Sequence, residues 1–516
     1  MSNENALYEL PNSWEWVKLG DICNTTSGGT PSRKNNSYFD GNIPWLKSGE
    51  LENGLIKKTE EFITHEGLNE SSAKIIPSGT LLIALYGATV GKLGILGIDS
   101  AINQAICAIF NPPEINLKYL FFYFLSYKEN LLNARKGGAQ PNISQQVIND
   151  VNFPISPLEE QKRIVAKIEE LFTELDAGVE LLKKLQIKLK CYRQSVLKAA
   201  VEGNLTQEWR AENQDKLEPA NQLLDRILKE RRKKWEAEQL AKFTAQGKHP
   251  KDDSWKLKYK EPSPPDVSNL PALPNGWCWA NIDQLSEVVR GASPRPAGDP
   301  KYFGGDIPWI TVGCLTTDNQ PYLTSVSNFV TEAGCKASRY VAPETLLLTN
   351  SGATLGVPKI TKIGGCINDG SVALLNVDYP LKLYLYYYLS TLTQKLRIIN
   401  QGAAQPNLNT GIVKAIILPF TCSNEQSKII EEIELRLSVI DQIEITIQTN
   451  LKRAEKLRQS ILKQAFQGKL VEQDPNDEPA AKLLERIKAE KAKQETKQAS
   501  KRKPKETAKP NQEKEP

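Results

Sequence analysis

Residues 11–16 read Pro-Asn-Ser-Trp-Glu-Trp and residues 274–279 read Pro-Asn-Gly-Trp-Cys-Trp, so one motif occurs twice, 263 positions apart. Further matches follow at a spacing that drifts only to 264 and then 265. They pair 38–45 with 302–309, 87–89 with 352–354, 139–142 with 404–407, and 193–195 with 458–460. Such a constant spacing indicates a duplicated unit, and two long copies indicate tandem domains rather than a solenoid.

Each copy begins with a segment that we predict to be a mixed α/β domain. Short apolar runs bounded by Gly, Pro and Asn predict strands at 79–85, 105–110, 345–349 and 371–375. Aromatic helices are expected at 119–127 and 384–389. We expect their rings, and those of Trp45 and Trp309, to pack in the core rather than to hold a cofactor or stack on a ligand.

Each copy then continues as a long helix. Its start is predicted by a capping box that is formed by Ser156, Pro157 and Glu159. The two helix ends are predicted at Gly203 and Gly468. Apolar residues recur every seven positions, at Ile168, Leu175, Leu182, Leu189 and Val196, and at Ile433, Ile440, Ile447, Ala454 and Ile461. A second seam contains Ile164, Leu171, Leu185 and Tyr192, with Ile429, Ile443 and Leu457. Some forty helical residues span about 60 Å, too long for one small domain to cover, so an antiparallel coiled coil is expected.

These features divide the chain into six segments. They are a first α/β domain (1–155), a first long helical region (156–243), a Pro-rich linker (244–273), a second α/β domain (274–420), a second long helical region (421–490) and a tail (491–516). A charged helix at 219–243 has an echo at 483–487, and it is either a solvated spacer or a partner-binding helix. The tail, rich in Lys, Gln, Glu and Pro, is expected to be disordered.

Composition limits the classes of function. The net charge is +5, but the residues from Lys482 onward hold twelve Lys or Arg and six Asp or Glu, a net of +6, so the rest sums to −1. Bulk charge is therefore no argument for nucleic-acid binding. The first twenty residues lack a signal-peptide core and no apolar run is long enough to span a membrane. Eight scattered cysteines predict free thiols in a reducing cytoplasm.

Catalytic motifs are not expected in this chain. Only two histidines occur, which argues against a metal site or histidine acid–base chemistry. The stretch 87–93 resembles a phosphate loop, but it has three residues where four are needed, and Leu93 replaces the hydroxyl residue. The stretch 111–114 resembles an amino-methyltransferase motif, but Glu114 stands where an aromatic ring is needed. We predict loops at both places, no catalytic residue and no metal.

The motif set as a whole resembles the specificity subunits of type I restriction-modification enzymes, over about residues 7–490. The matching stretches are 28–33 (GGTPSR), 43–45 (IPW), 85–91 (LYGATVG), 137–142 (GGAQPN) and 157–161 (PLEEQ). The second copy departs from this pattern at 290–295 and 348–352, which puts its base contacts in question rather than its fold.

The resemblance implies a non-catalytic subunit that reads double-stranded DNA. Each α/β domain would read one half of a bipartite, gapped site, and the coiled coil would set the gap, with pseudo-twofold symmetry. Two methyltransferase subunits that carry S-adenosylmethionine would methylate adenine, and restriction/translocase subunits that use ATP and Mg would complete the nuclease. Because the two copies differ outside their shared motifs, we expect an asymmetric site.

Loops that carry basic, amide and hydroxyl side chains are the candidate DNA-binding residues, since arginine pairs with guanine, amides pair with adenine, and lysine holds phosphates. The first set is Arg33, Lys34 and Asn36, with Arg290, Ser293 and Arg295. The second set is Tyr86, Thr89 and Lys92, with Asn350, Ser351 and Thr354. The third set is Gln140 and Asn142, with Gln405 and Asn407.

Three alternatives stay open at this point. The third set is identical in both copies, which favours a structural turn or a phosphate contact over base reading. The whole chain could instead be a structural coiled-coil interaction protein without DNA specificity. It could also be a fused methyltransferase-nuclease, although that enzyme would need the cofactor loop and catalytic motif that we do not find.

Overall fold

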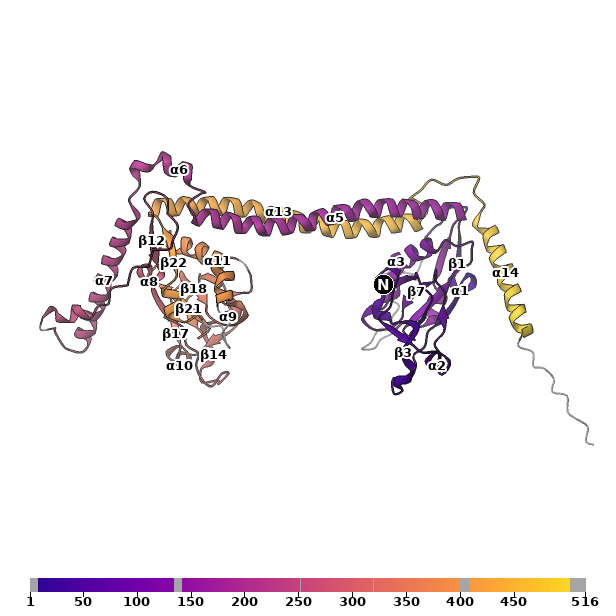
Figure 1. Ribbon diagram of the computed structural model, residues 1–516, viewed down its shortest axis with the longest axis horizontal. Coiled ribbons are helices and arrows are strands. Elements are labelled where there is room, and N and C mark those ends of the chain that lie inside the picture. Colours follow the sequence, from indigo (N-terminus) through magenta and orange to yellow (C-terminus); the bar gives the residue numbers. More distant parts are fainter. Residues whose placement is uncertain (1–7, 134–141, 251, 319, 400–407, 502–516) are drawn as a thin grey trace, which may run out of the picture. The chain divides into compact units, whose positions relative to one another are not determined.

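The computed structural model describes residues 8–133, 142–250, 252–318, 320–399 and 408–501 (Figure 1). The chain divides into two compact units. The first unit joins residues 1–183 to residues 448–516, and the second contains residues 184–447. Each unit therefore combines one α/β domain with parts of two long helices that are far apart in the sequence.

In its described residues, the α/β domain of the first unit contains three sheets and four α-helices. The strand orders are β1-β11, β2-β10-β7-β8-β4 and β5-β3-β9-β6. The strands are β1 (Glu15–Lys18), β2 (Asn24–Ser27), β3 (Phe39–Leu46), β4 (Gly54–Ile56), β5 (Glu61–Ile63), β6 (Ile75–Ile76), β7 (Leu81–Ala84), β8 (Leu93–Leu96), β9 (Ser100–Ile102), β10 (Ile106–Phe110) and β11 (Asn152–Ile155). The helices are α1 (Leu19–Ile22), α2 (His65–Asn69), α3 (Leu117–Asn133) and α4 (Gln145–Asn149), with short 3-10 turns η1 (Asn36–Tyr38), η2 (Ser48–Glu50) and η3 (Gly87–Thr89).

The α/β domain of the second unit repeats this arrangement. Its strand orders are β12-β22, β13-β21-β18-β19-β15 and β16-β14-β20-β17. The strands are β12 (Cys278–Asn281), β13 (Glu287–Arg290), β14 (Phe303–Ile310), β15 (Tyr322–Leu323), β16 (Phe329–Val330), β17 (Arg339–Val341), β18 (Thr345–Thr349), β19 (Pro358–Thr361), β20 (Gly365–Ile367), β21 (Ser371–Leu375) and β22 (Ile417–Phe420). The helices are α8 (Ile282–Leu285), α9 (Val312–Leu315), α10 (Glu332–Lys336), α11 (Leu381–Ile399) and α12 (Thr410–Lys414), with a 3-10 turn η6 (Gly352–Thr354).

The two domains share the same mixed topology. In each five-stranded sheet three antiparallel pairings are followed by one parallel pairing at the edge, β4 with β8 and β15 with β19. The strands predicted at 79–85 and 345–349 are found as β7 and β18, which are central strands of these sheets and are fully buried. The prediction of two tandem mixed α/β domains is confirmed.

The aromatic helices α3 and α11 are core elements, as predicted. The hydroxyl of Tyr119 donates a hydrogen bond of 2.9 Å to the carbonyl of Pro154, and that of Tyr384 donates one of 2.7 Å to the carbonyl of Pro419. Both tyrosines are at most 1% exposed. Each hydroxyl satisfies a backbone carbonyl of the strand beside the long helix, so burying these polar groups carries little penalty.

The long helices are α5 (Leu158–Val201) and α13 (Ser423–Phe466), with 44 residues each. Gly203 and Gly468 end them in the left-handed conformation, with φ of +73° and +67°, as predicted. The predicted capping box is wrong, because the buried hydroxyl of Ser156 has no hydrogen-bond partner and Glu159 pairs with Lys162. Tertiary contacts made by Gln161 hold the helix start instead, since its side chain donates to the carbonyl of Ser156 and accepts from the amide of Asn116.

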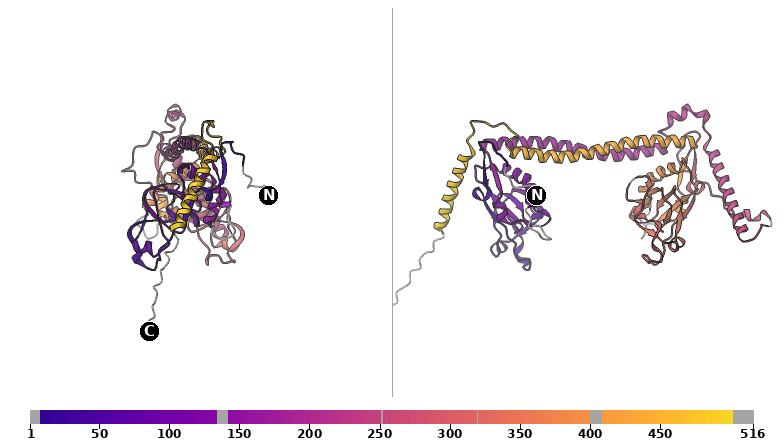
Figure 2. Two further views of the ribbon diagram at one scale, coloured as in Figure 1. Left: turned by 90° about the vertical axis from the view of Figure 1, so that its right-hand side faces the viewer. Right: turned by 180° about the vertical axis from the view of Figure 1, so that it is seen from behind.

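In each unit the two helices run antiparallel. In the second unit Arg193 pairs with Asp441, while the later residues Ala200 and Val201 of α5 share a core with the earlier residues 429–433 of α13. In the first unit Arg458 pairs with Asp176 and lies over the ring of Phe172. The neighbouring core there joins residues 164–168 of α5 to residues 461–466 of α13. The predicted antiparallel pairing is therefore present in both units (Figure 2).

Burial along the helices confirms the first apolar seam and corrects the second. Ile168, Leu189, Val196, Ile433, Ile440, Ile447 and Ile461 are buried, and Leu175, Leu182 and Ala454 are half-buried. In the second seam only Ile164 and Ile429 are buried and Leu171 is half-buried, whereas Leu185, Tyr192, Ile443 and Leu457 are exposed. A two-helix coil covers one narrow stripe, and the second stripe is covered only where an α/β domain packs against the helices.

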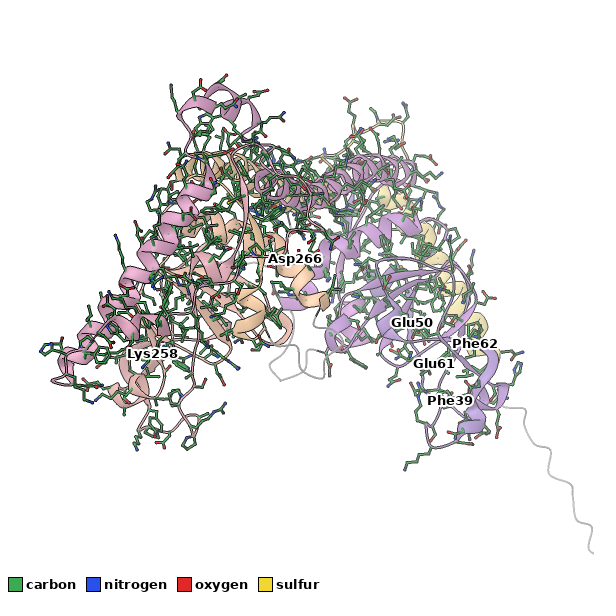
Figure 3. All side chains as sticks on the ribbon, turned by 60° about the vertical axis from the view of Figure 1, so that its left-hand side comes forward. Phe39, Glu50, Glu61, Phe62, Lys258 and Asp266 are labelled. Carbon is green, nitrogen blue, oxygen red and sulfur yellow. The ribbon has the colours of Figure 1, made fainter. Side chains whose placement is uncertain are left out.

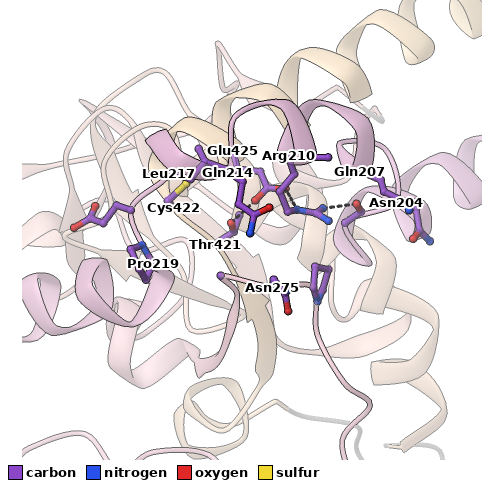
Figure 4. Close-up of a pocket in the computed structure, with 15 residues that line it drawn as sticks. Asn204, Gln207, Arg210, Gln214, Leu217, Pro219, Asn275, Thr421, Cys422 and Glu425 are labelled. Atoms are coloured by element: carbon purple, nitrogen blue, oxygen red, sulfur yellow. Dashed lines mark hydrogen bonds and ion pairs between the residues drawn. The ribbon is translucent and has the colours of Figure 1, made fainter.

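A hydrogen bond between tryptophan and glutamate joins each α/β domain to a long helix. Trp14 donates to Glu160 at 2.9 Å in the first unit, and Trp277 donates to Glu425 at 2.7 Å in the second. Glu425 also forms an ion pair with Arg210, beside a cavity of about 530 Å³ (Figure 4). Glu160 and Glu425 are 265 positions apart, the spacing of the repeat, so the same contact between the Trp motif and a long helix occurs in both units.

The charged helices are α7 (Ala220–Ala245) in the second unit and α14 (Ala480–Lys501) in the first, and each lies against the α/β domain of its unit (Figures 1 and 2). Ala220 and Ala480 donate their amides to the carbonyls of Gly276 and Ser13, inside the two copies of the Trp motif. Residues 483 and 487 are at most 2% exposed. A solvated spacer is therefore excluded for these inner faces. The last helix continues past residue 490, where the sequence ended its helical region, and residues 502–516 lie outside the described residues.

The segment between α5 and the second domain is also structured in part. It contains α6 (Gln207–Glu212), the 3-10 turns η4 (Gln214–Lys216) and η5 (Asp253–Lys258), and the loop that leads to β12. Trp255, 7% exposed, stacks on Trp235 of α7 with ring centroids 6.0 Å apart. The Pro-rich linker therefore folds back on α7 within the second unit.

Candidate nucleic-acid interface

In the second domain, the turn between β20 and β21 gathers predicted residues around Asp369. The hydroxyl of Ser293 donates to Oδ1 of Asp369 at 2.6 Å, and the guanidinium of Arg295 lies 3.6 Å from Oδ2. The backbone carbonyl of Asp369 accepts from Nε of Arg290 at 3.0 Å and from Nδ2 of Asn350 at 3.1 Å. The first and second sets therefore meet in one cluster at the end of the five-stranded sheet.

The first domain has the corresponding arrangement at the turn between β9 and β10. The hydroxyl of Thr30 donates to Oε1 of Gln104. The amide of Leu85 donates to the carbonyl of Ala105 at 2.8 Å, which places the loop after β7 beside this turn. Tyr86, the second residue of that loop, forms an isolated β-bridge with Asn142. The second set and the described part of the third therefore lie together here.

Two glycines allow the strand ends to approach these turns. A Cβ atom on Gly28 would collide with the carbonyl oxygen of Ile102, and one on Gly291 would collide with the carbonyl oxygen of Asn368. Only a residue without a side chain lets β2 and β13 run so close to the turn. The hydroxyl residues two positions later, Thr30 and Ser293, are thereby held against the turns.

Arg33 follows Thr30 by three residues and lies against the four-stranded sheet. Its guanidinium pairs with Glu61 at 2.7 Å and lies over the rings of Phe39 and Trp45. Figure 3 shows Phe39 and Glu61 at the same end of the first domain. Hydrogen bonds from Lys47 and Arg33 hold the pKa of Glu61 below its ordinary value. The guanidinium of Arg33 is therefore exposed to solvent, but its orientation is fixed by Glu61 and the two rings.

The remaining predicted residues occupy varied positions. Lys34 and Asn36 are exposed, and Asn36 opens η1. Thr89, Lys92, Ser351 and Thr354 are half-buried. Gln140, Gln405 and Asn407 lie outside the described residues. Asn350 is fully buried, so its position suits support of the Asp369 turn.

Gln104 and Asp369 were not selected from the sequence, although a signal was present. The stretches 102–104 (Ile-Asn-Gln) and 367–369 (Ile-Asn-Asp) match at the spacing of 265 in their first two residues and differ in the third. In both domains the shared asparagine stabilises the turn, since Asn103 accepts from the amide of Ala105 and Asn368 accepts from the hydroxyl of Ser371. The repeat therefore contains a shared pair of residues followed by a differing one, and the fold shows that the shared asparagine stabilises the turn.

The buried tryptophans Trp45 and Trp309, 2% and 7% exposed, are core residues, as predicted. Within the described ranges, no group of three or more His, Cys, Asp or Glu side chains is placed to hold a metal ion. No helix in this part of the chain is long and apolar enough to cross a bilayer. All eight cysteines are free thiols.

Known proteins share both the sequence pattern and the fold. The family model "Type I restriction modification DNA specificity domain" matches residues 11–190 and 274–454. The EcoDI and EcoBI type I specificity subunits of Escherichia coli are 23% and 25% identical to this chain. Their alignments cover 96% and 97% of this chain and 99% and 97% of the relatives.

Two solved structures have the same fold. One comes from work on complex assembly and conformational transition of the type I restriction-modification system, with a TM-score of 0.64, 20% identity, and coverage of 90% of this chain and all of that one. The other is the HsdS subunit from Thermoanaerobacter tengcongensis, with a TM-score of 0.52, 20% identity, and coverage of 90% and 99%. Because the family model matches most of the chain, as two tandem segments that coincide with the repeat, this protein belongs to the type I restriction-modification DNA specificity family.

Proposed function

We propose that this chain is the sequence-specific DNA-reading subunit of a type I restriction-modification complex. Each α/β domain reads one half of a bipartite, gapped site, and the subunit directs adenine methylation and restriction by its partners. The observation that carries this proposal is the duplicated sheet end. Two domains present the same backbone frame at residues 28–30 with 102–104 and at 291–293 with 367–369, yet the exposed side chains differ.

Different side chains on one frame suit the reading of two different half-sites. Base edges are distinguished by the pattern of donors and acceptors they present in the major groove. The Thr30–Gln104 pair and the Ser293–Asp369 pair offer different patterns, so the proposed site is asymmetric. The paired α5 and α13 helices extend from both domains, and in this proposal they set the distance between the half-sites.

The partners follow from the same proposal. Two methyltransferase subunits supply S-adenosylmethionine, and restriction/translocase subunits supply ATP hydrolysis with Mg. This chain contributes recognition and no catalytic group. Its free thiols suit the reducing cytoplasm, where the DNA target is found.

The test is to map methylated adenines in the host genome by long-read sequencing, with the gene intact and with the gene deleted. We expect one gapped two-part motif to lose methylation on deletion, and re-expression of the gene to restore it. A methyltransferase should co-purify with the tagged chain. If deletion changes no methylation and no methyltransferase co-purifies, the proposal is overturned in favour of a structural coiled-coil protein.

A further inference from the structure

The sheet-end frame isolates one variable position in each domain. Gly28 and Gly291, Ile102 and Ile367, and Asn103 and Asn368 are identical between the copies and build the frame. The next residue is Gln104 in one domain and Asp369 in the other. It accepts a hydrogen bond from the hydroxyl of Thr30 or Ser293, two positions after the glycine. The two domains therefore share the backbone arrangement, and they differ in the side chain at this one position.

Both side chains are available to a ligand. Gln104 is exposed, and the side chain of Asp369 is 45% exposed. The Thr30 and Ser293 contacts each restrict the rotamer of the residue they bind, which reduces the conformational entropy lost on recognition. Direct reading of a base edge requires a polar side chain that is exposed and whose orientation is fixed.

The two residues differ in what they offer. A glutamine amide presents both donors and an acceptor, and this combination pairs with N6 and N7 of adenine. An ionised aspartate presents acceptors only, and it pairs with an exocyclic amine, which cytosine and adenine carry in the major groove and guanine and thymine do not. Arg295, 3.6 Å from Asp369, provides a positive charge that offsets repulsion between the carboxylate and nearby phosphates.

We infer that Gln104 and Asp369 are the equivalent specificity-determining residues of the two domains, because one invariant frame presents them as exposed, hydroxyl-positioned side chains. This inference rests on the proposed DNA-reading function. Gln104 selects adenine at one position of one half-site. Asp369 selects a base with an exocyclic amine at the matching position of the other.

The experiment uses the full chain co-expressed with its methyltransferase partner in a host that lacks the system, and methylation is measured at every single-base variant of the motif. Asp369→Asn replaces the acceptor pair by an amide, so preference should shift toward adenine at one position of one half-site. Gln104→Glu gives the first domain the chemistry of the second, so cytosine should become acceptable at one position of the other half-site. Discrimination at the affected position should change roughly ten- to hundredfold.

The matched control is Asp378→Asn, which makes the same charge change beyond the opposite end of β21, at an exposed residue. We expect this variant to methylate the original motif. Ser293→Ala, which removes the hydroxyl contact but keeps the carboxylate, should weaken discrimination at the Asp369 position alone.

The outcomes separate this inference from the proposed function. If the original chain directs no gapped methylation, the proposed function fails. If it does, and folded Asp369→Asn and Gln104→Glu variants keep the original motif, the inference is overturned while the function stands. A uniform loss of methylation across all sequences by folded variants would assign these residues to backbone contacts and would also overturn it. If Asp369→Asn does not fold, Ser293→Ala is the test, and unchanged discrimination at the Asp369 position would overturn the inference.

Discussion

The indole nitrogen of Trp277 lies 2.7 Å from Oε2 of Glu425, and this carboxylate also accepts hydrogen bonds from Thr206, Arg210 and Thr421. Glu425 is 1% exposed, and the side chain of Arg210 is 14% exposed. One carboxylate therefore joins the second domain, the long helix α13 and the helix α6. In the first unit, Glu160 makes the equivalent bond to Trp14 and a second one to the neutral side chain of Gln473.

Glu425→Gln should destabilise the protein more than Glu160→Gln. The first change leaves a mostly buried arginine without its counter-charge, at a cost of about 3–5 kcal/mol. The second removes hydrogen bonds to neutral partners only, at a cost of about 1–3 kcal/mol. Urea unfolding of both variants measures the difference, and equal losses would contradict the assigned role of Arg210.

Ile440→Ala should cost about 2–5 kcal/mol, because Ile440 is 1% exposed in the helix pair and the change leaves a cavity. Ile443→Ala is the matched control, three residues later on the same helix and 36% exposed. Its cost should stay within about 0.5 kcal/mol, as for ordinary surface substitutions. Thermal unfolding followed by circular dichroism compares the two, and a similar loss from both would show that the second seam is covered in solution.

The Glu61 cluster should make stability depend on pH on the acidic side. Lys47 and Arg33 lower the pKa of Glu61 in the folded protein, so its stabilising contribution is complete above the unfolded-state pKa of about 4.3 and is lost as pH falls through the folded-state pKa. The difference in Tm between the original protein and Glu61→Gln should therefore be largest near neutral pH and should shrink below about pH 4.

Glu60→Gln is the control for this pH dependence. Glu60 is adjacent in sequence, its side chain is 77% exposed, and it lies 3.8 Å from the ammonium of Lys47. Its effect on Tm should be small at every pH. A pH-independent Tm difference for Glu61→Gln would mean that the Arg33–Glu61 pair does not form.

Asn350→Ala should lower stability without changing the DNA motif. Asn350 is fully buried, and its side chain donates to the carbonyl of Asp369. Removal of this bond should cost about 1 kcal/mol, measured as a shift in the urea midpoint. Ser351→Ala, at the half-buried neighbour, is the comparison and should leave stability within about 0.5 kcal/mol. A changed methylation motif in folded Asn350→Ala would instead place Asn350 among the base-reading residues.

Cys191 should be the fast-reacting thiol. It is the only exposed cysteine of the eight, whereas burial raises the pKa of Cys23, Cys107 and Cys366 to about 12. Since the thiolate is the reactive form, the buried thiols should be inert at pH 8. Titration of the native protein with a chromogenic disulfide reagent should show one fast phase that Cys191→Ser removes. Survival of the fast phase would contradict the placement of Cys191 on the outside of α5.

The sequence alone was sufficient for the architecture. The repeated Trp motif at 11–16 and 274–279 predicted two domains, and the seven-residue spacing from Ile168 to Val196 predicted the paired helices, because both patterns arise from local chain geometry that recurs at fixed spacing. The ends of the helices at Gly203 and Gly468 were predicted for the same reason, since a glycine after an apolar helix accommodates the left-handed turn.

Other features depended on which surfaces meet. Leu185 and Ile443 have the same spacing as buried residues, yet they are exposed, because the pairing of two helices buries only one narrow stripe of each. The start of α5 is held by Gln161 rather than by Ser156, because the side chain of Gln161 accepts a hydrogen bond from the amide of Asn116, which is distant in sequence. The composition of the charged helix α7 left open whether it is a solvated spacer or a partner-binding helix, but the inner faces of α7 and of its counterpart α14 complete the domain cores.

The sequence by itself therefore determined the duplication, the mixed α/β domains and the antiparallel helices, because periodicity and repetition can be recognised from the order of residues alone. The tertiary structure alone brought Thr30 to Gln104 and Ser293 to Asp369, 74 and 76 positions away along the chain. Hydrogen bonds between side chains so distant in sequence form only after the sheet has placed two strand ends together. The position that we assign to base reading could therefore be located only in the folded chain.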